Sequence, residues 1–274
     1  MDKLLILTGS DGSSAQLAGL ELLLHSFSEV GLNNNKYQFV LLCPSWTDRK
    51  AFLNFSKKYG CVSESVSLVK TNDKYYVKFV IQRYLLSNSF NDVSGILYLD
   101  FDHICLRSIN LPELHEDIVF VSSEVTPLVE MLGSANIPRI LWGLNGKHYN
   151  NSIIWAVPET FKKVAKRWSA AYRRLSSAIP LRYLEEVAFS LAAFEAGCTL
   201  VPVSPTVQGN WHIGVLDCSM FHYGGEHPLA EATKSSLNGD LIPKKIEHIL
   251  SPWPRNLQEL SKKIVTLARD LCSK

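Results

Sequence analysis

The chain has 274 residues, of which 46% are hydrophobic and 20% are charged, a composition that is typical of a folded globular protein and excludes a disordered chain. A chain of this length buries about 75% of the surface that its unfolded form exposes, so it needs neither disulfides nor a structural metal to fold. With 28 basic and 26 acidic residues the formal net charge is only +2. Binding to a phosphate backbone requires a more concentrated positive field, so we expect no nucleic-acid partner.

The six cysteines are scattered along the chain and form no Cys-x-x-Cys pair, which argues against a zinc ribbon or a redox dithiol. They are typical of small, buried hydrophobic side chains. The apolar run near the start, Leu4 to Thr8, is too short for the core of a signal peptide or for a membrane span. We therefore expect a protein of the reducing cytoplasm without a membrane-spanning helix.

The first hundred residues alternate predicted strands with predicted helices. Continuous apolar runs predict strands that are buried on both faces, and apolar residues three or four positions apart predict amphipathic helices. We expect strands over 4–8, 39–43, 66–69 and 95–100, and helices over 15–27, from Thr47 or Asp48 to about 59, and over 74–86. This order predicts right-handed βαβ crossovers and an α/β fold with a mostly parallel, twisted sheet, whose ligands bind beyond the carboxyl ends of the strands.

The second half of the chain is less regular. We expect strands over 118–121 and 153–157, helices over 158–174 and 180–196, and a loop-rich stretch over 202–254. A final helix over 256–274 carries leucines and isoleucine along one face and basic residues elsewhere. We expect this helix to dock on its own domain, with peripheral contact to the anionic inner face of a membrane as the alternative. The sequence does not indicate an oligomeric state.

Two carboxylates separated by one residue follow the predicted strand over 95–100. Because side chains alternate along a strand, we expect Asp100 and Asp102 to face the same side, about 6.5 to 7 Å apart, with Phe101 pointing away. Such a pair can hold a hard divalent cation, and without one the two charges repel and one carboxyl tends to take up a proton. The alternative is a pair of solvated acids in the turn after the strand.

The segment Ile96–Ile104, with the sequence ILYLDFDHI, resembles the LYLDxD metal motif of GT-A-fold glycosyltransferases. The resemblance is strongest to family eight, which holds glycogenin-like enzymes and lipopolysaccharide galactosyl- and glucosyltransferases. Further landmarks follow the family order: Tyr76–Phe79 opens the helix before the motif, Tyr149–Ile154 is similar to the family's FNSG strand, and Phe221–Gly225 resembles its His-x-x-Gly loop for metal and diphosphate. Together they span residues 4 to about 228.

The resemblance implies a GT-A-like, Rossmann-type domain over 1–255, with a nucleotide-sugar-binding half over 1–108 and an acceptor-side half over 109–255. It implies transfer of a hexose from a nucleotide sugar, which we expect to be UDP-linked, to a glycan or glycoconjugate, with retention at the anomeric carbon. A Mn²⁺ or Mg²⁺ ion would bridge the two phosphates and stabilise the leaving group.

By this resemblance, Asp102 and His222 are direct metal ligands, and Asp100 contacts both the metal and the ribose of the donor. An imidazole in a site otherwise made of oxygen atoms favours Mn²⁺ over Mg²⁺. A loop histidine bonded to the backbone is the alternative for His222.

The first strand ends in Thr8-Gly9-Ser10-Asp11-Gly12, which matches neither the Gly-x-Gly-x-x-Gly fingerprint nor a P-loop and so disfavours redox dinucleotides and kinase chemistry. The resemblance places nucleoside contacts at Thr8, Gly9 and Asp11. A tight turn that merely needs small residues is the alternative.

Three further residues are candidates for the diphosphate. Lys78 could balance the phosphate charge, although a lysine at the start of a long helix is more often solvated on the surface. Gly225 and His227 belong to the His-x-x-Gly loop, which here lacks the Lys-Pro-Trp that commonly follows it in the family. His227 could partly replace the missing lysine, but an unperturbed imidazole is mostly neutral at pH 7.

On the acceptor side, Asn151 offers donor and acceptor groups for sugar hydroxyls, with a role in capping the strand as the alternative. Glu185 and Glu186 stand where the family has an Asp-Gln pair, and either carboxylate could orient the acceptor hydroxyl; a charged face on an amphipathic helix explains them equally well. Trp211 could stack on a sugar ring or anchor its loop to the core.

Two other functions stay open at this point. The altered loop around His227 is compatible with a GT-A-like protein that binds nucleotide sugars but has lost turnover. A haloacid-dehalogenase-type phosphatase also carries an Asp-x-Asp at a strand end, but it usually places this motif after its first strand and has threonine or valine where this chain has Ile104.

Overall fold

The computed structural model describes residues 3–31, 36–70, 74–133, 137–179, 181–210 and 217–223. Its elements in the first half are β1 (Lys3–Gly9), α1 (Ser14–Glu29), β2 (Tyr37–Pro44), α2 (Lys50–Tyr59), β3 (Val62–Val66), the 3₁₀ helix η1 (Lys74–Lys78), α3 (Phe79–Ser87), β4 (Val93–Leu99) and β5 (His103–Cys105). The second half contains β6 (Ile118–Val121), β7 (Val125–Pro127), α4 (Leu128–Leu132), the 3₁₀ helix η3 (Arg139–Leu144), β8 (Lys147–Tyr149), β9 (Ile153–Ala156), α5 (Pro158–Leu175), α6 (Leu181–Glu195), β10 (Thr199–Pro202), β11 (Gln208–Asn210) and β12 (Met220–His222).

The central sheet has seven strands in the order β10-β6-β9-β4-β1-β2-β3. All neighbours pair in parallel except β9, which runs antiparallel to both β4 and β6. Because β9 is reversed, its first residue lies at the carboxyl edge of the sheet, where Ile153 pairs with Leu99 at the end of β4. The segment that precedes β9 therefore meets the segment that follows β4.

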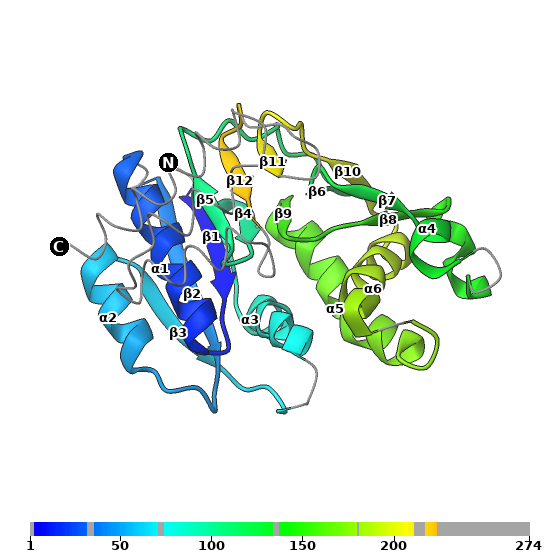
Figure 1. Cartoon of the computed structure of the whole chain (residues 1–274), viewed down its shortest axis with the longest axis horizontal. Coiled ribbons are helices and arrows are strands. Elements are labelled where there is room, and N and C mark those ends of the chain that lie inside the picture. Colours follow the sequence, from blue (N-terminus) through cyan, green and yellow to red (C-terminus); the bar gives the residue numbers. More distant parts are fainter. Residues whose placement is uncertain are drawn as a thin grey trace, which may run out of the picture.

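Helices cover both faces of this sheet, with α1 and α2 on one side and α3, α5 and α6 on the other (Figure 1). The alternation of side chains along β1 explains the two layers: Leu5 and Leu7 join the core cluster with α3, α5 and α6, whereas Ile6 joins the cluster with α1 and α2. All three side chains are at most 3% exposed. The continuous apolar run of β1 is thus buried on both faces, as its sequence predicts.

A small second sheet stands at the carboxyl edge, in the order β11-β12-β5 (Figure 1). It begins directly after the turn that leaves β4, because β5 starts at His103. Strand β12 runs antiparallel to β5 and places His222 opposite His103. This register brings a segment from late in the chain to the Asp-x-Asp turn.

The expected α/β class, the mostly parallel sheet and most of the expected helices are confirmed. The expected strand over 66–69 is wrong. Strand β3 spans Val62–Val66, where it pairs with β2 at the edge of the sheet. The expected helix over 74–86 begins as 3₁₀ helix η1 before it continues as α3. Two of the three-residue strands of the small sheet lie in the stretch that we expected to be loops. The expected helix over 256–274 lies outside the described residues, as does Cys272.

The five cysteines in the described part of the chain are buried, as expected, and none of them forms a disulfide with another. None of the described helices combines the length and the apolar character that crossing a bilayer requires.

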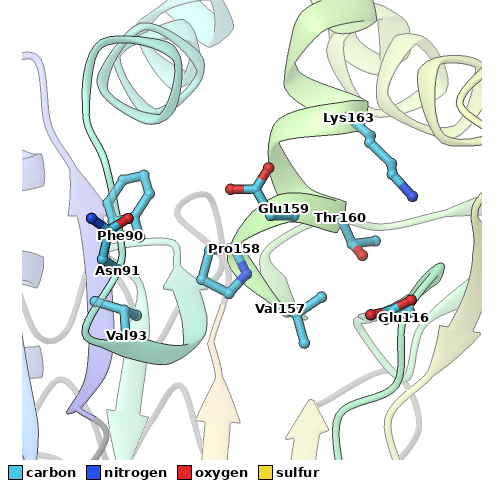
Figure 2. A pocket seen from close by; sticks show the side chains of 9 residues that line it. All are labelled: Phe90, Asn91, Val93, Glu116, Val157, Pro158, Glu159, Thr160 and Lys163. Carbon is cyan, nitrogen blue, oxygen red and sulfur yellow. The ribbon is translucent and has the colours of Figure 1, made fainter.

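A surface hollow of about 450 Å³ lies at the opposite end of β4 from the Asp-x-Asp turn (Figure 2). One wall comes from the residues around Val93, where β4 begins, and the other from the first turn of α5, including Pro158 and Glu159. None of the residues that the sequence singles out for chemistry lines this hollow. The hollow is therefore not the candidate site, whose predicted residues lie at the carboxyl edge of the sheet.

Candidate functional site

Asp102 and His222 meet at the carboxyl edge of the central sheet. The Asp102 Oδ1 and His222 Nε2 atoms lie 3.4 Å apart, and both side chains are largely buried, at 10% and 13% exposure. The pairing of β12 with β5 fixes this approach, and the Tyr223 amide beside it donates a hydrogen bond to the Asp102 carbonyl at 3.1 Å. The structure thus brings together the two residues that the sequence analysis predicts as direct metal ligands.

The electrostatics of this pair favour opposite charges. Burial opposes ionisation of Asp102, but the positive groups around it, first of all His222, together outweigh burial and lower the pKa of the Asp102 carboxyl below its usual range. Burial likewise opposes a charged His222, yet the carboxylate of Asp102 raises the pKa of that imidazole. In the absence of a metal, the two groups therefore stabilise each other as an ion pair.

One oxygen of this site is poorly satisfied within the protein. Asp102 Oδ1 is buried and accepts no well-aligned hydrogen bond from the described residues, its ionic contact with His222 Nε2 being 3.4 Å long. A buried carboxylate oxygen is costly unless it is fully compensated, and a cation bound between the two side chains would compensate it. A carboxylate and an imidazole are both ligands for Mn²⁺, so the residues present fit a divalent cation.

His103 is the third member of this cluster, and the sequence analysis did not single it out. Ligand atoms of Asp102, His103 and His222 all lie within 4.8 Å of one another. The His103 ring stacks on the His222 ring, with centroids 4.7 Å apart and an angle of 14° between the planes. Burial, together with the charge of His222, lowers the pKa of His103 to about 3. The only sequence signal for His103 is its position directly after Asp102.

Asp100 occupies a different place from the one expected. Strand β4 ends at Leu99, so Asp100 and Asp102 lie in the turn toward β5 and do not share one face of a strand. The Asp100 amide donates to the Ser152 carbonyl at 2.8 Å, and the Asp100 carboxylate accepts a hydrogen bond from the Tyr98 hydroxyl and pairs with Lys78. Its role at the metal stays a prediction.

Lys78 is buried in the site, which corrects the expectation of a solvated surface lysine. Its Nζ donates to Asn151 Oδ1 at 2.8 Å and pairs with Asp100 Oδ2 at 3.0 Å and Glu185 Oε2 at 3.3 Å. Burial disfavours the ammonium, but the surrounding carboxylates raise the pKa of Lys78 above its usual range. Lys78 is therefore charged, with three acceptors around its ammonium group.

Asn151 and Glu185 complete this network. The side-chain amide of Asn151 accepts from Lys78 and donates to Glu185 Oε1 at 2.6 Å, so both of its polar groups are engaged within the protein. Glu185 is 2% exposed, and burial raises the pKa of its carboxyl to about 7. A carboxyl with this pKa can give or take a proton near neutral pH.

Glu186 points to a second set of partners. Its Oε2 lies 2.8 Å from His148 Nε2, and its Oε1 accepts a weaker hydrogen bond from the Asn150 amide at 3.3 Å. Its side chain is 18% exposed, compared with 2% for Glu185. Of the two neighbouring carboxylates, Glu186 is the one that solvent or a bound molecule can reach more easily.

The three residues that we expect to contact a nucleoside lie at the end of β1 and in the turn that follows it, at the same edge. The Thr8 hydroxyl is fully buried and forms no hydrogen bond with the described residues. A side chain at Gly9 would lie 3.1 Å from Val80 Cγ2, so the close packing of β1 against α3 favours glycine there. Asp11 Oδ1 accepts a hydrogen bond from the Ser13 amide at 2.8 Å, which shapes the turn into α1. Their contacts with a nucleoside stay a prediction.

Three predicted residues lie outside the described part of the chain: Gly225, His227 and Trp211. Of the loop that would hold the diphosphate, the described residues include Phe221, His222 and Tyr223.

The described fold matches solved structures, whereas no family model and no curated protein matches the sequence. The galactosyltransferase LgtC, solved in complex with donor and acceptor sugar analogues, aligns with a TM-score of 0.60 and 11% identity over 97% of this chain and 95% of that chain. An active-site mutant of LgtC aligns with a TM-score of 0.60 and 10% identity over 84% of this chain and 94% of that chain.

The bifunctional glycosyltransferase WbbM, solved without ligands, aligns with a TM-score of 0.52 and 13% identity. This alignment covers 90% of the present chain and 51% of the WbbM chain. At such low identities the likeness establishes the fold. The chain has the GT-A fold of these glycosyltransferases, which confirms the fold class that the resemblance implies.

Proposed function

We propose that this protein is a metal-dependent glycosyltransferase that moves a hexose from a nucleotide sugar, expected to be UDP-linked, to a glycan or glycoconjugate. The observation that carries the proposal is the pairing of Asp102 with His222 at the carboxyl edge of a GT-A sheet. Ligands of open α/β sheets bind at this edge. The buried Asp102 oxygen, which accepts no well-aligned hydrogen bond from the described residues, supports the presence of a cation there.

Asp102 and His222 would hold the metal, and the mixed oxygen and nitrogen donors favour Mn²⁺ over Mg²⁺. When bound, the ion supplies a positive charge that stabilises the diphosphate leaving group as the sugar departs. Asp100, Glu185 and Glu186 would repel the phosphates, and Lys78 is already paired with Asp100 and Glu185. A bound cation would add the positive charge that favours an anionic donor in this site.

The donor nucleoside would lie against the end of β1. Thr8 offers a buried hydroxyl that has no partner among the described residues, and Gly9 and Asp11 shape the turn that follows it.

The sugar side of the site would be formed by the network around Lys78. The Lys78 ammonium orients Asp100, Asn151 and Glu185, and Asp100, whose side chain is 16% exposed, is the member of this network that a hexose hydroxyl would reach. Glu186, held by His148, would accept a hydrogen bond from the acceptor hydroxyl and orient it for attack. Retention at the anomeric carbon is part of this proposal and rests on the family resemblance.

Thermal denaturation with UDP in the presence of Mn²⁺ or EDTA, combined with an assay for hydrolysis of UDP-sugars, tests the proposal. Stabilisation by UDP that depends on Mn²⁺, together with hydrolysis, is the expected result. Stabilisation without hydrolysis of any UDP-hexose would favour a nucleotide-sugar-binding protein without turnover. Absence of both would contradict the proposed function.

A further inference from the structure

His103 is fully buried at the start of β5, directly after the Asp-x-Asp turn. Its Nδ1 lies 3.1 Å from the Asp100 carbonyl oxygen, and its Nε2 lies 2.8 Å from Gln208 Nε2. Both ring nitrogens therefore have a partner within the protein. The roles of donor and acceptor in these two contacts decide the state of the ring.

Gln208 determines these roles. The Ser123 backbone amide, which can only donate, donates to Gln208 Oε1 at 3.1 Å. This contact identifies Oε1 as the carbonyl end of the side chain, so the NH₂ group faces His103 and Ser152 Oγ, at 2.8 and 3.1 Å. Because the NH₂ group only donates, His103 Nε2 must accept and cannot carry a proton. His103 is then neutral and carries its proton on Nδ1, which donates to the Asp100 carbonyl.

This arrangement separates His103 from His222 in function. Although the ligand atoms of His103 lie in the same cluster as those of Asp102 and His222, neither of its ring nitrogens is available to a metal without breaking a buried hydrogen bond. Its ring face, in contrast, is stacked on His222 with an angle of 14° between the planes. A buried ring held at both nitrogens restricts the plane in which its stacked neighbour can lie.

We propose that His103 is a positioning residue for the metal: Gln208 locks it as the neutral Nδ1–H form, and its ring holds His222 oriented toward Asp102. The proposal rests on the proposed function, because it assigns a supporting role at the same metal site. Gln208 also bonds Ser123, after β6, and Ser152, before β9. The orientation of the metal-binding imidazole is thus tied to two strands of the central sheet.

Mn²⁺ binding by the full chain, measured by EPR, tests this role without an activity assay. Pulsed EPR counts the imidazole nitrogens bound to Mn²⁺, and we expect one in the wild type, one in His103→Phe and none in His222→Ala. His103→Phe keeps an aromatic face, so its Kd should stay within about threefold of the wild type. His103→Ala removes the face and should weaken binding by about 10- to 100-fold, the range seen when groups that support metal ligands are removed. The exposed His115→Ala is the matched control and should bind like the wild type.

Two results would overturn the proposal: two bound imidazole nitrogens in the wild type with one lost in His103→Phe, or a folded His103→Ala that binds Mn²⁺ as tightly as the wild type. Long-range ¹H–¹⁵N NMR of the metal-free wild type adds a readout that needs no variant. It should show His103 protonated on Nδ1, and protonation on Nε2 would also overturn the proposal. Failure of the wild type to bind Mn²⁺ at all would instead contradict the proposed function. The wild-type measurement therefore distinguishes a wrong role for His103 from a wrong function for the protein.

Discussion

Asp102 Oδ1 and His222 Nε2 lie 3.4 Å apart, although the two residues belong to distant parts of the sequence. The antiparallel pairing of β12 with β5 produces this contact, because it places His222 beside the residue that follows Asp102. The contact depends on main-chain pairing, so the geometry is present before any ligand binds. A preformed pair of ligands needs little rearrangement to accept a cation.

Replacing Asp102 tests the ligand assignment. A metal that binds only the folded protein, present at a concentration about 100 times its Kd, stabilises the protein by about 2.7 kcal/mol. We expect Asp102→Asn to lose this stabilisation by Mn²⁺. Thermal denaturation with Mn²⁺ and with EDTA measures it. Asp92→Asn, an exposed position at the other end of β4, is the matched control and should keep the response. An Asp102→Asn protein that keeps it would show that the ligands are misassigned.

Replacing Lys78 tests the buried charge network. Lys78→Met leaves Asp100 and Glu185 without their counter-charge, and breaking a buried pair in this way costs about 3 to 5 kcal/mol of the free energy of unfolding. Urea denaturation measures the loss. The control is Lys163→Met, because Lys163 pairs with Asp117 where both side chains are about half exposed. Loss of such an exposed pair should have little effect on stability. Equal stability of the two variants would contradict the burial of Lys78.

The carboxyl of Glu185 should give the protein a pH-dependent stability. Burial raises its pKa from 4.5 to about 7, so the folded protein holds this proton in a range where the unfolded chain has released it. The stability of the wild type relative to Glu185→Gln should therefore fall as the pH rises from about 4.5 to about 7, by on the order of 3 kcal/mol.

Urea denaturation across this pH range measures the difference between wild type and Glu185→Gln. Glu195→Gln, at the partly exposed end of the same helix where Glu195 pairs with Arg174, is the control and should show no such fall with rising pH. A difference between wild type and Glu185→Gln that stays constant with pH would show that Glu185 titrates as an ordinary carboxyl.

Gly19 lies where α1 approaches the Asp-x-Asp turn. A β-carbon there would lie 2.7 Å from the Phe101 ring and 3.1 Å from the Phe101 carbonyl oxygen. We expect Gly19→Ala to displace the turn and to cost about 1 to 3 kcal/mol, since the main-chain oxygen cannot yield as a side chain would. Equilibrium denaturation measures the loss of stability, and Mn²⁺ titration detects the displaced turn as weaker metal binding. Glu21→Ala on the same helix is the control. Unchanged stability and Mn²⁺ affinity in Gly19→Ala would argue against this packing.

The sequence predicts the inner strands of the fold well because their apolar runs are long. β1, β2 and β4 are buried on both faces and stand out as continuous hydrophobic segments. The edge strand β3 is half-exposed and lacks such a run, which is why the strand was expected over 66–69 instead. Strands β5 and β12 have three residues each. Segments this short are too short to show the alternation of apolar and polar residues that predicts a strand.

The candidate site could be predicted only where a local motif marks it. Asp102 and His222 are recognisable from their neighbours in the sequence, by resemblance. The burial of Lys78 was not predictable, because its three partners come from the turn after β4, the segment before β9, and α6. The contact of His103 in β5 with Gln208 in β11 likewise depends on the small sheet, in which β12 lies between these two strands.

The most direct test of the account is the position of a bound manganese ion. Crystals of the wild-type protein grown with Mn²⁺ and UDP would be measured at the manganese absorption edge, and the anomalous difference map would locate the ion. We predict a single strong peak in contact with both the Asp102 carboxylate and His222 Nε2. A map without a peak there, or with the ion bound elsewhere and touching neither residue, would contradict the proposal that these two side chains share a cation.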